Sequence, residues 1–272
     1  MPELPEVETT RRGIAPMLHN RVPRQVVVRQ VKLRWPVPVT ALQGWCGAPI
    51  EQVWRRGKWL GLSSDHGHVL IHLGMSGCLR IVPADCPVQA HDHVDVVLDH
   101  GKVLRYTDPR RFGAWLFTAT DPLHHPRLRH LGPEPLSAAF TSEWLACQCS
   151  RSRRAIKALI MDSRVVVGVG NIYATEALFR AGIHPARGAN TLSKRAVSRL
   201  VAEIQAVLAA AIEQGGTTLQ DFTRPDGRPG YFAQALQVYG RAGQPCPRCG
   251  TLLHQQQIAQ RSSVFCPVCQ PL

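Results

Sequence analysis

Four cysteines near the C-terminal end constrain this chain more than any other feature of its sequence. They form two C-x2-C pairs, Cys246 with Cys249 and Cys266 with Cys269, separated by 16 residues. Thiolates at this spacing are typical of a tetrahedral structural zinc site. Because four protein ligands complete the coordination sphere, no position remains for a reactive water. The pattern therefore predicts one structural Zn2+ that stabilises a small module and takes no part in chemistry.

The segment between the two cysteine pairs is predicted to form a hairpin whose tip carries Gln260, Arg261 and Ser262. An arginine on a small rigid hairpin suits a contact with a phosphate or a minor groove. A solvated turn is the alternative interpretation of Arg261. The nine cysteines are odd in number and unevenly spaced, so they do not indicate a disulfide framework. The remaining five are interpreted as reduced thiols: Cys46, Cys78, Cys86, Cys147 and Cys149.

The charge balance of the 272 residues restricts the partners. Lys and Arg number 32 against 19 Asp and Glu, a formal net charge of +13. Such an excess favours polyanionic partners, with nucleic acid the first candidate and an anionic membrane surface the second. No apolar run approaches the roughly 20 residues of a spanning helix, and the charged start carrying Glu3, Glu6 and Glu8 is unlike a signal peptide. We expect a soluble, cytoplasmic protein.

The hydrophobic pattern changes character along the chain. Val7, Ile14 and Leu18 predict a helix over 5–18. From about 21 to 118, short β-branched runs broken by Gly and Pro predict an antiparallel sandwich or barrel-like domain. The expected strands are 26–31, 52–55, 59–63, 68–72, 79–82, 94–98, 103–106 and 114–118, and the helices expected after a linker at 131–135 are 141–148, 153–162, 172–181 and 193–213.

These elements predict an α+β chain in three parts. Residues 1–134 form a β-domain with an N-terminal helix, residues 135–240 form a helical domain, and residues 241–272 form the metal module. Gly215 and Gly216 are expected to end the long helix before them.

Pro2 is a candidate nucleophile. If the initiator Met1 is removed, Pro2 carries a free secondary amine, and an α-amino group has a pKa of about 7.7–8.0. Attack of such an amine on an acetal carbon forms an iminium, which acts as an electron sink in covalent catalysis. The alternative is that Pro2 only marks a processed start.

A Gly-x-Gly sequence in the helical half indicates a second candidate site. Gly168 and Gly170 allow close approach of another group, and Asn171 is predicted to cap the following helix. Backbone amides at a helix N-terminus suit a phosphate, and Lys157 on the preceding helix is expected on the same surface. The G-x-G-x-x-G pattern fails at Tyr173, and no organic cofactor is predicted. A tight turn between packed helices is the alternative.

Six motifs occur in a fixed order along the chain. They are Pro2-Glu3-Leu4-Pro5-Glu6, Arg56-Gly57-Lys58, His72-Leu73-Gly74-Met75-Ser76-Gly77, Asp108-Pro109-Arg110-Arg111-Phe112-Gly113, Gly168-Val169-Gly170-Asn171-Ile172-Tyr173 and the four cysteines. Together they resemble the bacterial formamidopyrimidine-DNA glycosylase family. The resemblance spans essentially the whole chain and implies a two-layer β-sandwich, a helix-two-turn-helix domain with a lesion-capping loop, and a zinc-finger hairpin.

The resemblance also implies a reaction, base-excision repair of oxidised purines in duplex DNA. Pro2 attacks C1′ of the damaged nucleotide, Glu3 acts as an acid near the sugar ring oxygen, and both phosphates leave by β- and δ-elimination. Lys58 is expected to contact the phosphate beside the lesion.

The remaining implied roles concern DNA contacts. Met75, Arg110 and Phe112 fill the gap left by the extruded nucleotide, with Arg110 facing the orphaned cytosine. The implied partner is double-stranded DNA with the oxidised base opposite cytosine, bound by a monomer. The expected DNA-binding residues are His91, Arg110, Lys157, Asn171 and Arg261.

Two alternatives stay open at this point. A sister family resembling endonuclease VIII shares the fold and nucleophile but prefers oxidised pyrimidines, although Leu4 and the Arg110-Arg111-Phe112 segment favour the formamidopyrimidine branch. A non-catalytic zinc-dependent DNA-binding protein is the other. Gln220 stands where many members of the family have Lys or Arg, which leaves the base preference open.

Overall fold

The structure is a computed structural model that describes residues 2–216 and 235–272. Its packing divides the chain into two units. The first is Met1–His130 with the described part of Gln214–Ala233, and the second is Leu131–Glu213 with the described part of Gln234–Leu272. Gln220 and the loop at 223–230 lie outside the described residues. No helix within the described ranges is long and apolar enough to span a bilayer.

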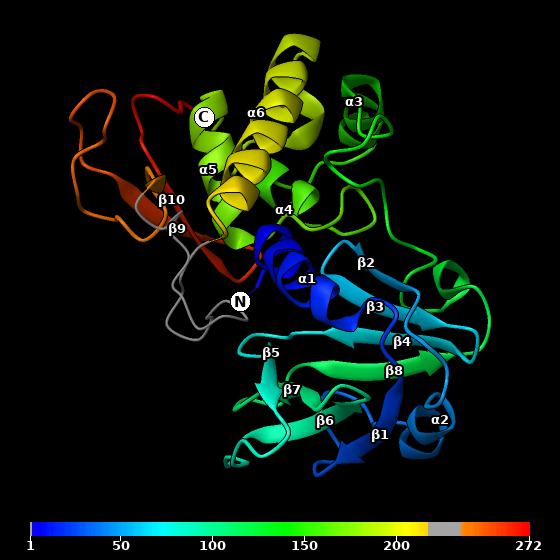
Figure 1. Cartoon of the computed structure of the whole chain (residues 1–272). Coiled ribbons are helices and arrows are strands. Elements are labelled where there is room, and N and C mark those ends of the chain that lie inside the picture. Colours follow the sequence, from blue (N-terminus) through cyan, green and yellow to red (C-terminus); the bar gives the residue numbers. More distant parts are fainter. Residues whose placement is uncertain (1, 217–234) are drawn as a thin grey trace. The chain divides into compact units, whose positions relative to one another are not determined.

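The first unit is built around two four-stranded antiparallel sheets (Figure 1). One sheet has the order β1-β6-β7-β5 and the other β2-β3-β4-β8. The predicted β-sandwich is therefore confirmed. The strands are β1 (Pro23–Val28), β2 (Gln52–Arg56), β3 (Trp59–Ser64), β4 (Gly67–His72), β5 (Cys78–Pro83), β6 (Asp92–Leu98), β7 (Lys102–Thr107) and β8 (Ala114–Thr118).

The facing sides of the two sheets form the apolar core of this unit. Leu62 and Ile71 from one sheet and Val96 and Leu104 from the other are fully buried members of one cluster. Burying a side chain of this size contributes about 1.5–3 kcal/mol. Alternate residues of each strand supply the core, because side chains alternate between the two faces of a strand.

Helix α1 (Leu4–Leu18) packs against β2, β3 and β5. Its buried apolar residues include Leu4, Val7 and Ile14, so the predicted helix is confirmed. Glu8 connects it to β2, because its carboxylate accepts hydrogen bonds from Arg11, Arg12 and Arg55. Burial would raise the pKa of Glu8, but these three arginines outweigh it and lower the pKa to about 2.

One predicted strand of this unit has other bounds in the structure, and one short helix was not predicted. Strand β1 was expected over 26–31 but covers Pro23–Val28. The backbone N–H groups of Arg29 and Gln30 both point to the His93 carbonyl, which ends regular pairing and leaves Val31 exposed. The short helix α2 (Val39–Gly44) was not predicted, because its sequence lacks a cap and a helical hydrophobic pattern.

The second unit holds the predicted helices and the cysteine module (Figure 1). The helices are α3 (Ser142–Ser150), α4 (Ile156–Ile160), α5 (Asn171–Ala181) and α6 (Lys194–Glu213), followed by the hairpin strands β9 (His254–Ile258) and β10 (Arg261–Phe265). The segment interpreted as a linker packs closely on this unit. A side chain at Gly132 would collide with the backbone of Arg164, and the Gly132 N–H donates to the Ser163 carbonyl.

Candidate active site and nucleic-acid interface

The start of α1 positions Pro2 and Glu3. Pro2 is buried, and the Glu3 N–H donates to Glu6 Oε2 at 2.8 Å as part of a capping box. Such reciprocal bonds satisfy the free N–H groups of the first turn and fix the entry of the chain. Glu6 is fully buried, and Gly216 (φ +79°) passes so close that a Cβ there would lie 3.0 Å from Glu6 Oε1. The start of the helix is therefore held firmly.

Lys58 lies in the two-residue turn between β2 and β3. Arg56 pairs with Trp59 across this hairpin, and Gly57 has φ +58°, a left-handed conformation that glycine tolerates well. The Arg55 guanidinium donates to the Gly57 carbonyl at 2.9 Å and to Glu8 at 3.1 Å. The turn that carries Lys58 is thus connected to α1 through Arg55.

His72 is a partly buried neighbour of this turn that the sequence argument did not single out. Burial and the positive charges of Lys58 and Arg34 lower its pKa to about 3, so its imidazole is neutral near pH 7. Its Nδ1 accepts the Gly74 N–H at 2.9 Å, and its ring meets Trp59 edge-on at 5.0 Å. The only sequence signal was its place at the start of the His72–Gly77 motif.

Two loops of the first unit are locked together at one edge. A Cβ at Gly74 (φ +67°) would collide with the backbone of Phe112 and Gly113. The Ser76 hydroxyl donates to Asp108 Oδ1 at 2.6 Å and accepts the Arg110 N–H at 3.2 Å. Only glycine at position 74 lets the Phe112 and Gly113 backbone come this close. The glycine of one motif is therefore explained by the backbone of another.

Asp108 is the centre of this arrangement. Its carboxylate is fully buried, and Oδ2 accepts the Tyr106 hydroxyl at 2.9 Å and the Gly113 N–H at 2.8 Å. Its backbone N–H donates to the His91 carbonyl at 3.0 Å. Burial, together with Asp108, raises the pKa of Tyr106 well above 10, so the tyrosine stays a donor. Buried acceptors satisfied in this way give a loop one defined conformation.

Met75, Arg110 and Phe112, predicted from separate motifs, are brought together by these two loops. The ring of Phe112 is 47 % exposed, and the Arg110 guanidinium lies 5.1 Å above its centre. Met75 is partly buried. An exposed aromatic ring with a cation over it is a planar pair suited to contact with nucleobases. His91 is exposed and joins the same edge through the Asp108 N–H.

The prediction that Asn171 caps α5 is wrong. Gly170 is the N-cap, and Asn171 is the first residue of the helix. The Asn171 Oδ1 is buried and has no hydrogen-bond partner among the described residues. Gly168 has φ +81°, so the turn before the helix requires a glycine at this position.

Lys157 is fully buried. Its ammonium donates to the Ser262 carbonyl at 3.0 Å and to Ser263 Oγ at 2.7 Å. It therefore holds β10 to α4 in this conformation. A hollow of about 430 Å3 lies beside it, lined among others by Arg154, Arg164 and Arg261.

The four cysteines fit a zinc ion. Their Sγ atoms all lie within 4.8 Å of one another, with Cys246 and Cys269 at 3.9 Å and Cys249 and Cys266 at 3.5 Å. A tetrahedron with Zn–S bonds of about 2.3 Å has edges of about 3.8 Å. The site binds one structural Zn2+, as predicted.

The predicted hairpin is confirmed, but its turn comes earlier than predicted, because Arg261 and Ser262 belong to β10. Arg261 pairs with Ile258, so the turn is Ala259 and Gln260, both with positive φ (+47° and +59°). Arg261 is the first residue of β10 and is exposed.

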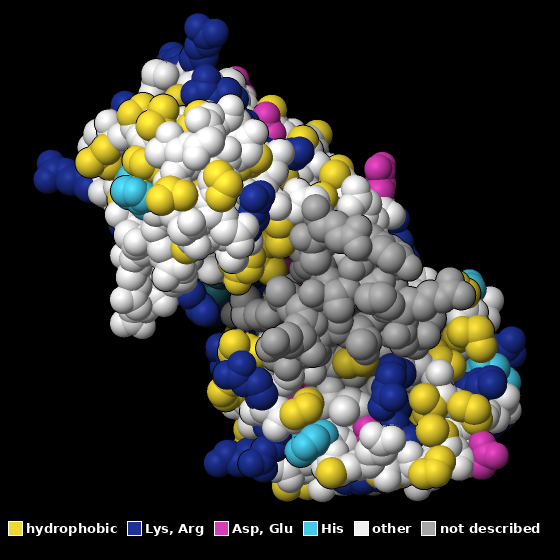
Figure 2. Space-filling view, turned by 90° about the vertical axis from the view of Figure 1, so that its left-hand side faces the viewer, with side chains coloured by type: hydrophobic (Ala, Val, Ile, Leu, Met, Phe, Trp, Pro, Cys, Tyr) yellow, Lys and Arg dark blue, Asp and Glu magenta, His cyan; other side chains and the backbone are white. Residues whose placement is uncertain are grey.

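Basic side chains are spread over both units. Figure 2 shows many Lys and Arg side chains and few acidic ones on this face of each unit. A surface of this kind attracts polyanions and makes their binding depend on salt.

Three family descriptions match consecutive parts of the chain. Residues 1–115 match the formamidopyrimidine-DNA glycosylase N-terminal domain, residues 131–223 match the formamidopyrimidine-DNA glycosylase H2TH domain, and residues 243–272 match the zinc finger found in FPG and IleRS.

Relatives and solved structures agree with these matches. A formamidopyrimidine-DNA glycosylase of Photobacterium profundum is 57 % identical over 270 residues, 99 % of this chain and 100 % of the relative. The MutM (Fpg) protein from Thermus thermophilus, whose crystal structure is known, is 42 % identical in sequence. Its structure matches with a TM-score of 0.89 over 99 % of this chain and 98 % of the Thermus chain. A Lactococcus lactis Fpg variant in complex with DNA containing Fapy-dG is 32 % identical, with a TM-score of 0.93 and full coverage of both chains.

Proposed function

This chain belongs to the formamidopyrimidine-DNA glycosylase family, and on that premise we propose how it carries out base-excision repair. It is a bifunctional DNA glycosylase and abasic-site lyase that acts on oxidised purines in duplex DNA. The observation that carries this assignment is the meeting of Met75, Arg110 and Phe112 at one edge of the unit that also carries Pro2. A protein that only binds DNA would not need both features.

The edge formed by these three residues replaces the extruded nucleotide. A base inside a duplex is out of reach, so it must be flipped out at a cost of a few kcal/mol. Met75 and the Phe112 ring enter the vacated space and recover part of that cost. Arg110 faces the orphaned base, which the proposal takes to be cytosine.

Pro2 and Glu3 carry the chemistry. The Pro2 nitrogen, freed by removal of Met1, bonds to C1′ as the bond from C1′ to the base breaks. Glu3 protonates the sugar ring oxygen, the C1′–O4′ bond opens, and a C1′ iminium remains. The iminium makes the C2′ proton acidic, so the 3′-phosphate leaves by β-elimination. A second proton loss releases the 5′-phosphate by δ-elimination.

Lys58 contacts the phosphate beside the lesion. Neutral His72 next to it adds no positive charge, and its bond to the Gly74 N–H positions the turn that carries Met75. His72 is therefore a positioning residue in this proposal.

Three residues of the second unit contribute to DNA binding in different ways. Arg261 is exposed and contacts the backbone. Asn171 donates its Nδ2 hydrogens to a backbone phosphate, which only accepts hydrogen bonds. Lys157 acts through the hairpin, because the Ser262 carbonyl and Ser263 Oγ, which accept its hydrogen bonds, both belong to β10. His91 contacts DNA from the first unit. The zinc ion holds the hairpin that carries Arg261 and enters no step of the reaction.

In this proposal the protein has three functional parts, residues 1–134, 135–240 and 241–272. It acts in the cytoplasm as a monomer. Specificity for oxidised purines over oxidised pyrimidines is supported by the family, and rates on duplexes with 8-oxoguanine or thymine glycol test it. Faster excision of thymine glycol would overturn the choice.

Borohydride trapping tests the mechanism directly. A duplex with 8-oxoguanine opposite cytosine is mixed with the protein, and the reduced adduct is mapped by peptide mass spectrometry. The expected adduct is at Pro2 and is lost in Pro2→Gly and in protein that retains Met1. An adduct at a lysine would overturn the assignment of Pro2 as the nucleophile. If DNA binding were intact but no adduct formed, the assignment of the protein as a glycosylase and lyase would be overturned.

A further inference from the structure

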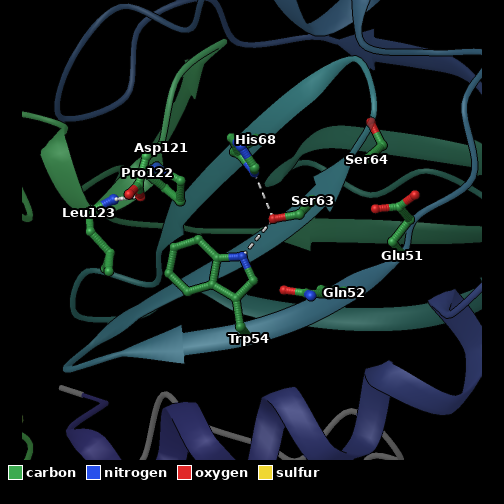
Figure 3. Close-up of a pocket in the computed structure, with 9 residues that line it drawn as sticks. All are labelled: Glu51, Gln52, Trp54, Ser63, Ser64, His68, Asp121, Pro122 and Leu123. Carbon is green, nitrogen blue, oxygen red and sulfur yellow. Dashed lines mark hydrogen bonds between the residues drawn. The ribbon is translucent and has the colours of Figure 1, made fainter.

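A hollow of about 390 Å3 lies on the β2-β3-β4-β8 sheet, among residues to which the proposed repair reaction gives no role (Figure 3). We call it the Trp54 pocket. None of the residues assigned above to catalysis, DNA binding or zinc lines it. Its lining consists of Glu51, Gln52, Trp54, Ser63, Ser64, His68, Asp121, Pro122 and Leu123.

The floor of the Trp54 pocket is rigid. A Cβ at Gly61 would overlap the Trp54 indole, so the ring lies directly on the β3 backbone. The indole Nε1–H donates to Ser63 Oγ at 2.8 Å, and Ser63 Oγ is 2.7 Å from His68 Nδ1 (Figure 3). Because Ser63 Oγ accepts the hydrogen bond from the indole N–H, its own hydroxyl hydrogen is free to donate to His68 Nδ1. The indole nitrogen is satisfied, and the π-face of the ring is what remains for a ligand.

The rim is acidic in a strongly basic protein. The chain carries 32 Lys and Arg residues, yet no described Lys or Arg lines the pocket, whereas Glu51 and Asp121 do. Asp121 is held in place because its Oδ1 accepts the Leu123 N–H at 2.8 Å. Glu51 is exposed and forms no ion pair with any described residue. This lining repels phosphate and attracts a cation.

One wall of the pocket is apolar, formed by Pro122 and Leu123. Figure 3 shows Pro122 and Leu123 on one side of the Trp54 ring and Glu51 on the other. Leu123 is 52 % exposed. A cation on an apolar stem fits such a site, because the stem covers Leu123 while the charge lies over the indole and near the carboxylates.

A second hollow extends the site along the same strand. It has a volume of about 490 Å3 and shares Glu51, Gln52 and Trp54 with the first. Its other lining residues are Ala15, Pro16, His19 and Val53, again without Lys or Arg among the described residues. Two hollows that meet at β2 fit an extended chain segment better than a single small molecule.

We propose that the Trp54 pocket binds the arginine or lysine side chain of an extended, basic segment of a partner protein. The cation lies against the Trp54 ring between Glu51 and Asp121, and the flanking residues of the segment cross β2 into the second hollow. This interaction does not depend on lesion chemistry, so binding and DNA incision can be measured separately.

The test follows the indole signal of Trp54 by 1H–15N NMR in the zinc-loaded full chain. The chain has six tryptophans, and Trp54→Phe identifies the signal that belongs to Trp54. The probes are blocked arginine, blocked citrulline as its neutral counterpart, and a blocked heptapeptide with one central arginine.

The expected result is a saturable shift of the Trp54 signal with arginine and none with citrulline. The heptapeptide is expected to bind at least about tenfold more tightly than blocked arginine, because it also uses the second hollow. Glu51→Gln combined with Asp121→Asn is expected to weaken binding about tenfold. Asp85→Asn, an exposed acid elsewhere in the same unit, leaves binding unchanged, and all variants keep wild-type incision.

Three outcomes would overturn the proposal. Equal binding of citrulline would show an apolar slot that does not select charge. Equal affinity of blocked arginine and the heptapeptide would show that residues beside the arginine add nothing to binding, which excludes an extended partner segment. If Asp85→Asn weakened binding as much as the double variant does, the loss of affinity would come from the net charge of the protein and not from the two carboxylates of the Trp54 pocket.

Discussion

The loop pair around Asp108 and the zinc hairpin position candidate DNA-contacting side chains by opposite means. In the first, a fully buried carboxylate accepts the Ser76 hydroxyl, the Tyr106 hydroxyl and the Gly113 N–H. In the second, four thiolates bind one zinc ion, and a small apolar cluster surrounds Cys246 and Cys266.

This difference has a physical cause. The loops lie at the edge of a β-sandwich with a large core, so a few hydrogen bonds suffice to select one conformation. The hairpin module is too small to build such a core, and a metal ion compensates for it. The second unit also holds the segment before the module, because Glu176 accepts the N–H groups of Gln237, Val238 and Tyr239.

Removal of zinc should have the largest effect. Structural zinc contributes on the order of 10 kcal/mol to small metal modules, so Cys266→Ser or chelation should unfold the hairpin and reduce DNA affinity more than about 100-fold. Zinc content, DNA affinity and near-ultraviolet circular dichroism measure this. The first unit should keep its cooperative unfolding transition, and its loss would contradict the independence of the two regions.

Asp108→Asn tests the loop pair, which is the other region of the comparison. The amide presents a donor to groups that are themselves donors, so the unfolding free energy should fall by about 2–4 kcal/mol. Incision should fall more than affinity for undamaged DNA, because the Met75 and Arg110 loops lose their common anchor. Urea unfolding and single-turnover incision check this, with the exposed Asp65→Asn as control. Unchanged incision would remove Asp108 from its positioning role.

Lys157→Met distinguishes positioning from direct contact. Leaving Ser263 Oγ and the Ser262 carbonyl without their donor should cost about 1–3 kcal/mol of stability. If Lys157 acts only through the hairpin, DNA affinity falls while the slope of affinity against salt stays the same. A slope reduced by about one unit would instead indicate a phosphate contact.

Glu8→Gln should change how stability depends on pH. The folded pKa of Glu8 is lowered from 4.5 to about 2, so its contribution is present above about pH 4.5 and is lost as the pH falls toward 2. After allowance for solvent screening, the contribution is about 1–2 kcal/mol. Urea unfolding between pH 2 and 7 should show the variant approaching the wild type at low pH. A constant difference would contradict the role of the charge.

Asn171→Ala should have the smallest effect on folding. Since Oδ1 has no partner in the described structure, the unfolding free energy should change by less than about 0.5 kcal/mol. DNA affinity should nevertheless fall by about 1 kcal/mol if the amide binds the backbone. A large loss of stability with normal DNA affinity would reverse this interpretation.

Sequence patterns succeeded where the signal is local. The apolar face of α6, with Val197, Leu200 and Ile204, repeats with helical spacing, and the cysteine spacing alone indicates the zinc hairpin. Resemblance of short motifs was enough to identify the residues that meet at the edge of the first unit. It could not say why they meet.

Contacts between distant segments were decided by tertiary structure alone. The closeness of Gly74 to Phe112 and the two bonds of Lys157 to β10 join residues 38 to 106 positions apart. Such contacts leave no periodic trace, because a single glycine or lysine looks the same buried as exposed. The sequence by itself determined the metal site, most of the helices and strands, and the family. Lys157 and the Asp108 carboxylate are fully buried, and only folding removes water from them. The Trp54 pocket also depends on folding, because its lining residues 51–68 and 121–123 are distant in the sequence.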